Sequence, residues 1–198
     1  MKEWTVKFLR SEKSVLVIIL AAAAVRAVYL VQLHGSDLEW ILPLDMNFYR
    51  DLAAGLSRGE LPPGGLTFNP LYPLFLAAVI RIAGSSLLVP RIIQAALGVV
   101  TIYLHYLAGR EITVTGNRLR TGLLAASLAL FYPQFLLYEG SYLATSLVTF
   151  MLIASLLTAI RLDRQLAEGN TGERYTARGV FLGVILGAGA LGRPNLFL

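Results

Sequence analysis

Long apolar runs constrain the fold of this chain more than any other feature of its sequence. The first, Val15 to Leu33, has about 19 residues and is nearly all apolar. An α-helix rises 1.5 Å per residue and the hydrocarbon core of a bilayer is about 30 Å thick, so this run is long enough to cross a membrane. We read this run, like the later ones, as a membrane-spanning helix.

Four later runs have the same character, so we expect about five transmembrane helices. They are expected near residues 15–33, 87–108, 121–138, 143–160 and 179–198. Only 15% of the residues are charged and the mean hydropathy is +0.65, whereas soluble domains carry about 25% charged residues. The sequence therefore predicts an all-α, polytopic membrane protein that forms a single module over residues 1–198. We expect the first run to be a retained anchor rather than a cleaved signal peptide, because its small residues, Ala21 to Ala24, lie in mid-segment.

A shorter apolar run, Leu71 to Gly84, decides the predicted topology. As a helix it covers only about 21 Å, which is too short to cross the bilayer upright. If it lies at the outer interface, eleven Lys and Arg residues fall in cytoplasmic segments and four fall in outer loops. If it crosses the membrane, six fall in cytoplasmic segments and nine fall in outer loops. The positive-inside rule favours the first arrangement. Its cytoplasmic set is Lys2, Lys7, Arg10, Lys13, Arg110, Arg118, Arg120, Arg161, Arg164, Arg174 and Arg178, and its outer set is Arg50, Arg58, Arg81 and Arg91.

The charge count gives an orientation to the polar residues as well. It predicts a cytoplasmic N-terminus and a long first outer loop over residues 34–86, which contains juxtamembrane helices. One of these is expected at Asn47 to Leu56, before a segment rich in Gly and Pro. In this arrangement Asp45, Glu139 and Arg193 all reach the extracytoplasmic side of the membrane. In a prokaryote, this would be the cytoplasmic membrane.

Two acids and two arginines are the candidates for chemistry. Asp45 follows Pro43 and begins a helix, so it is either a helix-capping acid or a catalytic one. Glu139 precedes Gly140 between two apolar runs and is alternatively a solvated loop acid. Arg26 lies in the first span and either snorkels to the interface or meets an anion in a polar cavity. Arg193 stands before a helix-breaking Pro, where it can bind phosphate bidentately.

Several classes of function are not expected. The chain has no cysteine, and it carries no P-loop, dinucleotide fingerprint, HExxH motif or Ser-His-Asp set. Nucleic-acid binding is not expected, because the basic residues lie in short loops as orientation signals and no basic patch is interleaved with exposed aromatics.

An ordered set of short motifs resembles a known family. The motifs are Arg26-Ala27-Val28-Tyr29-Leu30, Leu44-Asp45-x-x-x-Tyr49, Asn69-Pro70-Leu71-Tyr72-Pro73-Leu74, Arg91-x-x-Gln94-x-x-Leu97-Gly98, Tyr132-Pro133, Tyr138-Glu139-Gly140 and Gly192-Arg193-Pro194-Asn195. Together they resemble the N-terminal part of a GT-C membrane glycosyltransferase, of the protein O-mannosyltransferase and lipid A aminoarabinose transferase type.

The resemblance implies a polyprenyl-phosphate-linked sugar as donor and an acid of the first outer loop as catalytic residue, which Asp45 matches. Arg26, Tyr49, Glu139 and Arg193 are then the expected substrate-binding residues, with Arg91 a weaker candidate for the leaving phosphate. The sequence departs from the family pattern at two positions where many relatives carry a second acid. Met46 follows Asp45 where many relatives have an acid, and Thr145 stands where many have Glu.

The implied function is transfer of a sugar to an extracytoplasmic protein, lipid or glycan. The alternative is a non-enzymatic polytopic protein, such as a lipid transporter or an assembly subunit, whose polar groups only line a cavity. No firm cofactor is expected, and a divalent cation held by Asp45 and Glu139 would have a poor site with two carboxylates alone. Relatives are much longer, so the expected partners are the donor, the bilayer and either a missing C-terminal half or a partner subunit.

Overall fold

The computed structural model describes residues 13–41, 44–63, 65–66 and 69–193, and these residues form helices and no strand. The helices are α2 (Lys13–His34), the short 3-10 helix η1 (Asp37–Glu39), α3 (Leu44–Ser57), α4 (Leu71–Ala83), α5 (Leu88–Ile112), α6 (Arg118–Leu130), α7 (Pro133–Glu139), α8 (Thr145–Ala167) and α9 (Glu173–Gly192). The expected all-α fold is thus confirmed for the described part of the chain.

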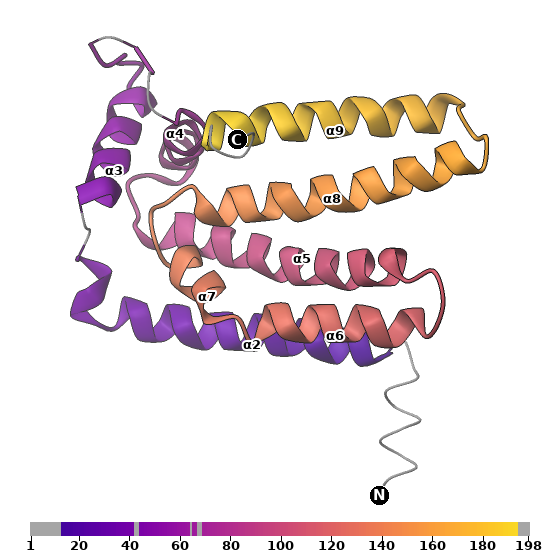
Figure 1. The fold of residues 1–198 in the computed structure, drawn as a ribbon. Helices are drawn as coiled ribbons and strands as arrows, with labels where there is room; N and C mark the ends of the chain where they lie inside the picture. The colour runs from indigo at the N-terminus through magenta and orange to yellow at the C-terminus, as the bar shows by residue number, and fades with distance from the viewer. Residues whose placement is uncertain (1–12, 42–43, 64, 67–68, 194–198) are drawn as a thin grey trace, which may run out of the picture.

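Five helices lie alongside one another and form a bundle, and the chain runs back and forth through α2, α5, α6, α8 and α9 (Figure 1). Two ends of this bundle can be distinguished. The connections at residues 113–117 and 168–172 mark the end that we call the loop end. At the other end, the α4 end, lie α3, α4, α7 and the last turn of α9 (Figure 1).

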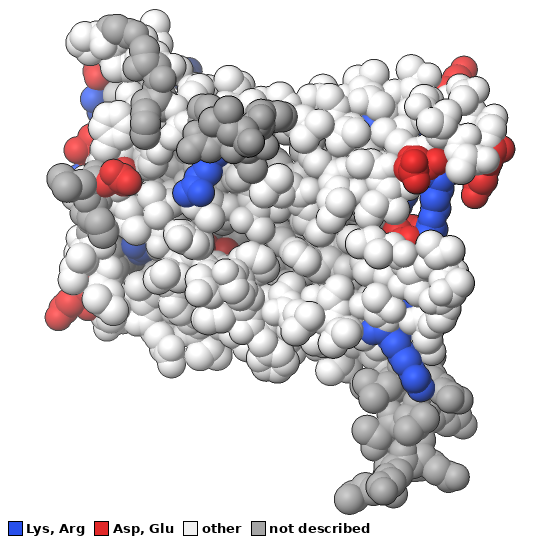
Figure 2. Space-filling view, in the orientation of Figure 1, with Lys and Arg blue, Asp and Glu red and all other residues white. Residues whose placement is uncertain are grey.

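Within the described residues, α2, α5, α8 and α9 are each long and apolar enough to cross a membrane. The pair formed by α6 and α7 makes a fifth candidate, with a bend of 56° between its two parts. Figure 2 shows Lys, Arg, Asp and Glu gathered at the two ends of the bundle, with an almost uncharged band between them on this face. These features are those of a multi-pass membrane protein.

The third span, expected near residues 121–138, is formed by two helices with a bend between them. Helix α6 stops at Leu130, and α7 starts at Pro133 in a new direction. Tyr132 has an extended backbone, with φ −87° and ψ 101°, as a residue before proline prefers. Since Pro133 also lacks an N–H to continue the ladder, the break is a local consequence of this dipeptide. It brings Glu139, the last residue of α7, against the bundle interior.

Helix α4 has 13 residues and is among the shorter apolar helices. It lies across the end of the bundle, where Figure 1 shows it end-on beside α3. Gly84 ends the helix with a positive φ of 74°, and its N–H bonds the carbonyl of Ile80. This placement agrees with a helix that does not span, and α3 corresponds to the helix expected at residues 47–56, extended by three residues at its start and one at its end.

Helix α5 is the central helix, because it contacts α2, α4, α6, α7 and α8. Its most extensive contact is with α6, where Gly109 faces Gly122. A Cβ built on Gly109 would lie 3.0 Å from the Cα of Gly122 and 2.9 Å from the carbonyl oxygen of Thr121. Small residues let helix backbones pack this closely in membrane bundles. The packing fixes one face of α5 against α6, while another face carries the polar side chains described below.

Candidate functional site

A buried ion pair joins two helices near the α4 end of the bundle. Arg26 of α2 and Glu139 of α7 are only 3% and 4% exposed, and Nη2 of Arg26 donates to Oε1 of Glu139 at 2.7 Å. The second terminal nitrogen, Nη1, donates to the carbonyl of Ala22 at 3.3 Å. Charges removed from water need close partners, so each of these two groups depends on the other for its place in the apolar interior.

Two glycines make room for this pair and its neighbour. A Cβ on Gly98 of α5 would overlap the carboxylate of Glu139 and lie 2.7 Å from Nε of Arg26. A Cβ on Gly140 would collide with the ring and hydroxyl of Tyr29. Because Gly98 and Gly140 lack side chains, Arg26 and Glu139 can pack against α5, and Tyr29 of α2 can pack against the end of α7.

Gln94 of α5 holds the connection between α7 and α8. Its Nε2 donates to the backbone carbonyls of Glu139 at 2.7 Å and Ser141 at 2.8 Å, and more weakly to that of Tyr138 at 3.4 Å. Its Oε1 accepts from the hydroxyl of Tyr72 on α4 at 2.6 Å. Burial raises the pKa of Tyr72 well above its usual value, so the phenol stays protonated and donates. One fully buried amide thus ties α4 and α7 to α5.

Arg91, one turn before Gln94, supports the same connection. Its Nε donates to the carbonyl of Gly140 at 2.8 Å, and its guanidinium lies 5.2 Å from the ring centre of Tyr142. The hydroxyl of Tyr142 in turn donates to the carbonyl of Leu87 at 2.7 Å. The backbone that carries Glu139 is consequently fixed by several charge-assisted and neutral hydrogen bonds from α5.

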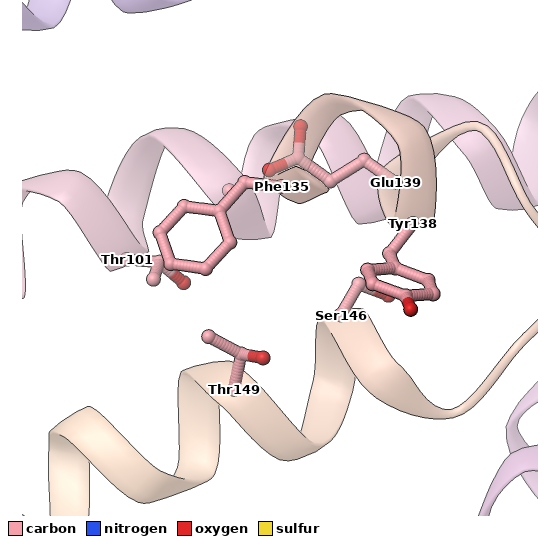
Figure 3. Close-up of a pocket in the computed structure, with 7 residues that line it drawn as sticks. Thr101, Phe135, Tyr138, Glu139, Ser146 and Thr149 are labelled. Carbon is pink, nitrogen blue, oxygen red and sulfur yellow. The ribbon is translucent and has the colours of Figure 1, made fainter. Parts of the chain in front are cut away.

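A small cavity lies beside Glu139 (Figure 3). Its lining residues come from α5, α7 and α8 and are Gly98, Thr101, Phe135, Tyr138, Glu139, Ser146 and Thr149. Two buried atoms of this lining, Oε2 of Glu139 and Oγ of Ser146, have no hydrogen-bond partner among the described residues. The space for the centre of a water molecule is about 10 Å³, which is room for about one water. The cavity is too small for a sugar.

Asp45 lies in a different environment from the ion pair. It is exposed in the first turn of α3, where the helix dipole favours a negative charge. It forms no hydrogen bond or ion pair with any residue that the structure describes. The guanidinium of Arg26 is instead enclosed with Glu139 and Ala22, and the described residues show no contact between Asp45 and Arg26, which were expected to approach each other through a polar cavity.

Arg193 follows the last turn of α9 and is exposed, and its Nη2 donates to Oγ1 of Thr145 at 3.3 Å. The helix ends one residue before Arg193, as expected, although Pro194 lies outside the described residues. Tyr49 is only 6% exposed and packs edge-on against Tyr72, with ring centres 5.5 Å apart. Its ring belongs to the core between α3 and α4, which does not fit the expected contact with a substrate.

The importance of Gln94 and Gly98 was not predicted from the sequence, although both stand in a motif that was noted. The signal for their role is the spacing of Arg91, Gln94 and Gly98, which places the three on one face of α5. Polar residues at helical spacing within an apolar run indicate a buried polar contact, but the spacing leaves the partner unspecified.

No group of three or more His, Asp or Glu side chains in the described part of the chain lies close enough to hold a metal ion. For the cation that Asp45 and Glu139 were considered to share, the geometry is unfavourable. One oxygen of Glu139 is bonded to Arg26 and its carboxylate is buried, whereas Asp45 is exposed.

Over the part of the chain that the structure describes, the fold is all-helical, with four apolar helices long enough to span a membrane, or five if the bent pair is one span. Comparison with known proteins adds no family to this class: no family model, no curated protein and no solved structure matches the chain.

Proposed function

We propose that the protein is a membrane glycosyltransferase that takes a sugar from a polyprenyl-phosphate-linked donor and transfers it to an extracytoplasmic acceptor. The observation that carries the proposal is the position of Asp45. This carboxylate is exposed on a helix that lies across the end of the bundle, and the last turn of α9, which leads into the exposed Arg193, lies at the same end. The ordered motifs described above support the same class of enzyme.

The α4 end is the extracytoplasmic end in this proposal. The loop end carries most of the basic side chains of the described residues, as a cytoplasmic end does under the positive-inside rule. These side chains are Lys13, Arg110, Arg118, Arg120, Arg161, Arg164, Arg174 and Arg178.

In the reaction, an acceptor hydroxyl attacks the anomeric carbon of the donor, and the bond from that carbon to the phosphate oxygen breaks. Asp45 accepts the proton of the hydroxyl, which is the role of a general base. Arg193 stabilises the negative charge on the leaving phosphate. A single displacement of this kind inverts the anomeric centre. Arg26 and Glu139 neutralise each other in the interior and act as a structural pair that fixes α7, rather than as the substrate contacts expected from the sequence.

A second cavity at the α4 end suits the lipid part of such a donor. It has a volume of about 160 Å³ and lies between α3, α4 and the start of α5. Its lining is mostly apolar, with Leu76, Ile80 and Leu87 among its members and Arg50 as its charged residue. Apolar walls with a few polar groups are typical of sites for amphipathic ligands.

One observation favours the alternative, a non-enzymatic polytopic protein such as a lipid transporter or assembly subunit. Asp45 does not line either of the cavities described above. In that case Asp45 is only a first-turn acid of α3, and the buried polar cluster has a purely structural role.

Asp45→Asn separates the two functions. Membranes that contain the protein are supplied with radiolabelled polyprenyl-phosphate sugars, beginning with mannose, and transfer to endogenous acceptors is measured. Asn keeps the shape and removes the basicity, so turnover should fall by roughly 10²- to 10⁴-fold with donor binding nearly unchanged. Asp51→Asn, an exposed acid of the same helix, is the matched control and should retain activity. Full turnover in folded Asp45→Asn protein would remove Asp45 from the mechanism, and failure of the wild type to bind any such donor would favour the alternative.

A further inference from the structure

An open groove lies between α8 and α9 near the loop end, opposite to the end where we place sugar transfer. It has a volume of about 290 Å³, and its lining residues are Thr158, Arg161, Ala177, Arg178 and Phe181. Two of these five residues are arginines, one from each helix. The groove is therefore a basic pocket between two apolar helices.

The positive charge of this groove is poorly compensated. Arg178 is half-buried and forms no ion pair or hydrogen bond with any described residue. Nε of Arg161 lies 3.5 Å from Oε1 of Glu111, but the same carboxylate also accepts from Arg118 at 2.9 Å and makes a closer contact with Arg164. One carboxylate thus faces three guanidinium groups. The groove retains an excess of positive charge that an anion would neutralise.

The acids nearest in sequence do not cancel this excess. Asp163 is exposed and stands two residues from Arg161, which places it on a different face of α8. Glu173 is exposed in the first turn of α9 and forms no ion pair with the described residues. Neither acid lines the groove.

The two arginines also lie at matching depths. Arg161 stands six residues before the end of α8, and Arg178 stands five residues after the start of α9. At 1.5 Å per residue, both Cα atoms lie about 8 to 9 Å inside the ends of their helices. From this depth a long Arg side chain can extend along its helix to the level of the lipid headgroups.

The remaining lining continues the groove with apolar surface. Phe181 is 52% exposed and lies almost one turn beyond Arg178 on α9. Most of α9 is exposed in the bundle, including Val180 and Val184. A ligand that fits this arrangement has an anionic group for the two arginines and an apolar chain for Phe181.

We infer that this groove binds an anionic phospholipid of the bilayer, with its phosphate between Arg161 and Arg178 and an acyl chain along Phe181. Guanidinium groups bind phosphate oxygens bidentately, and basic pockets between spanning helices are suited to anionic headgroups. The bound lipid would join the loop ends of α8 and α9. This site does not depend on the proposed transfer reaction, which involves other residues at the α4 end.

The test measures phospholipid binding directly. The full protein is purified in a mild detergent and titrated with phosphatidylglycerol or phosphatidylcholine, and the bound lipid is counted by native mass spectrometry. Phosphatidylglycerol should bind at least about tenfold more tightly than phosphatidylcholine. Arg178→Gln and Arg161→Gln should each weaken its binding by about tenfold or more, because each removes a charge-assisted contact. Millimolar inorganic phosphate should not displace the lipid.

Arg174→Gln is the matched control, since it removes an exposed arginine of the same helix, one turn closer to the loop. It should bind phosphatidylglycerol like the wild type. Arg178→Lys keeps the charge and should retain more binding than Arg178→Gln, which distinguishes a lost contact from a misfolded protein. Equal binding of the two lipids, or equal losses for Arg174→Gln and Arg178→Gln, would overturn the inference. Displacement by phosphate alone would assign the groove to a soluble anion instead.

Discussion

Removing one partner of the buried ion pair between Arg26 and Glu139 should destabilise the protein more than removing one partner of an exposed ion pair. Replacing Glu139 with Leu removes the only carboxylate that is bonded to Arg26 among the described residues, while the guanidinium stays in the apolar interior. An uncompensated buried charge of this kind costs about 3 to 5 kcal/mol. Comparable costs are known for single charges within membrane-spanning helices.

A double variant tests the physical reason for this loss. In Arg26→Met with Glu139→Leu, both charges are absent and both side chains remain close to the original volume. Replacing both members of a buried pair by apolar residues is often neutral or stabilising, so the double variant should be markedly more stable than Glu139→Leu alone. The two substitutions are thus strongly non-additive, since the residues are in direct contact.

The assay is reversible unfolding in mixed micelles, with the free energy of unfolding measured against the fraction of denaturing detergent. The matched control is the exposed pair Arg58 and Glu60, whose Nη2–Oε2 distance of 2.8 Å is nearly that of the buried pair but whose side chains are 61% exposed. Arg58→Met should leave the stability almost unchanged. A double variant as unstable as the sum of its two single variants would refute the reasoning, as would equal losses for Glu139→Leu and Arg58→Met.

Two further predictions follow from the packing and the charge distribution. Gly98→Ala should destabilise the protein by about 1 to 3 kcal/mol in the same assay, because its Cβ would overlap the buried pair. The control Gly183→Ala should be neutral or slightly stabilising, because no atom lies within 4 Å of the added Cβ. Equal effects of the two substitutions would contradict this account. The chain has no cysteine, so Ser85→Cys and Thr115→Cys, both at exposed positions, can be labelled one at a time. An impermeant maleimide should label Ser85→Cys from outside the cell and Thr115→Cys only after permeabilisation, and the opposite pattern would reverse the proposed orientation.

Local features of the sequence were sufficient to predict most of the helices, although not η1 or α7 as a separate helix. The lengths of the apolar runs predict helices that can cross a bilayer, because spanning length and backbone satisfaction are properties of a single segment. The short run at residues 71–84 was also recognised as different from the others, and α4 does lie across the end of the bundle. The bend before α7 was not predicted, although Pro133 is its local cause.

The partners of the polar side chains were decided only by the tertiary structure. Arg26 and Glu139 are 113 residues apart, and α2 is apolar around most of its circumference, so its sequence does not indicate which face meets the bundle. Tyr49 was expected near a substrate, but the packing of α3 on α4 buries it against Tyr72. Sequence pattern gives the cost of burying a polar group, whereas the rotation and packing of whole helices determine which other group offsets that cost.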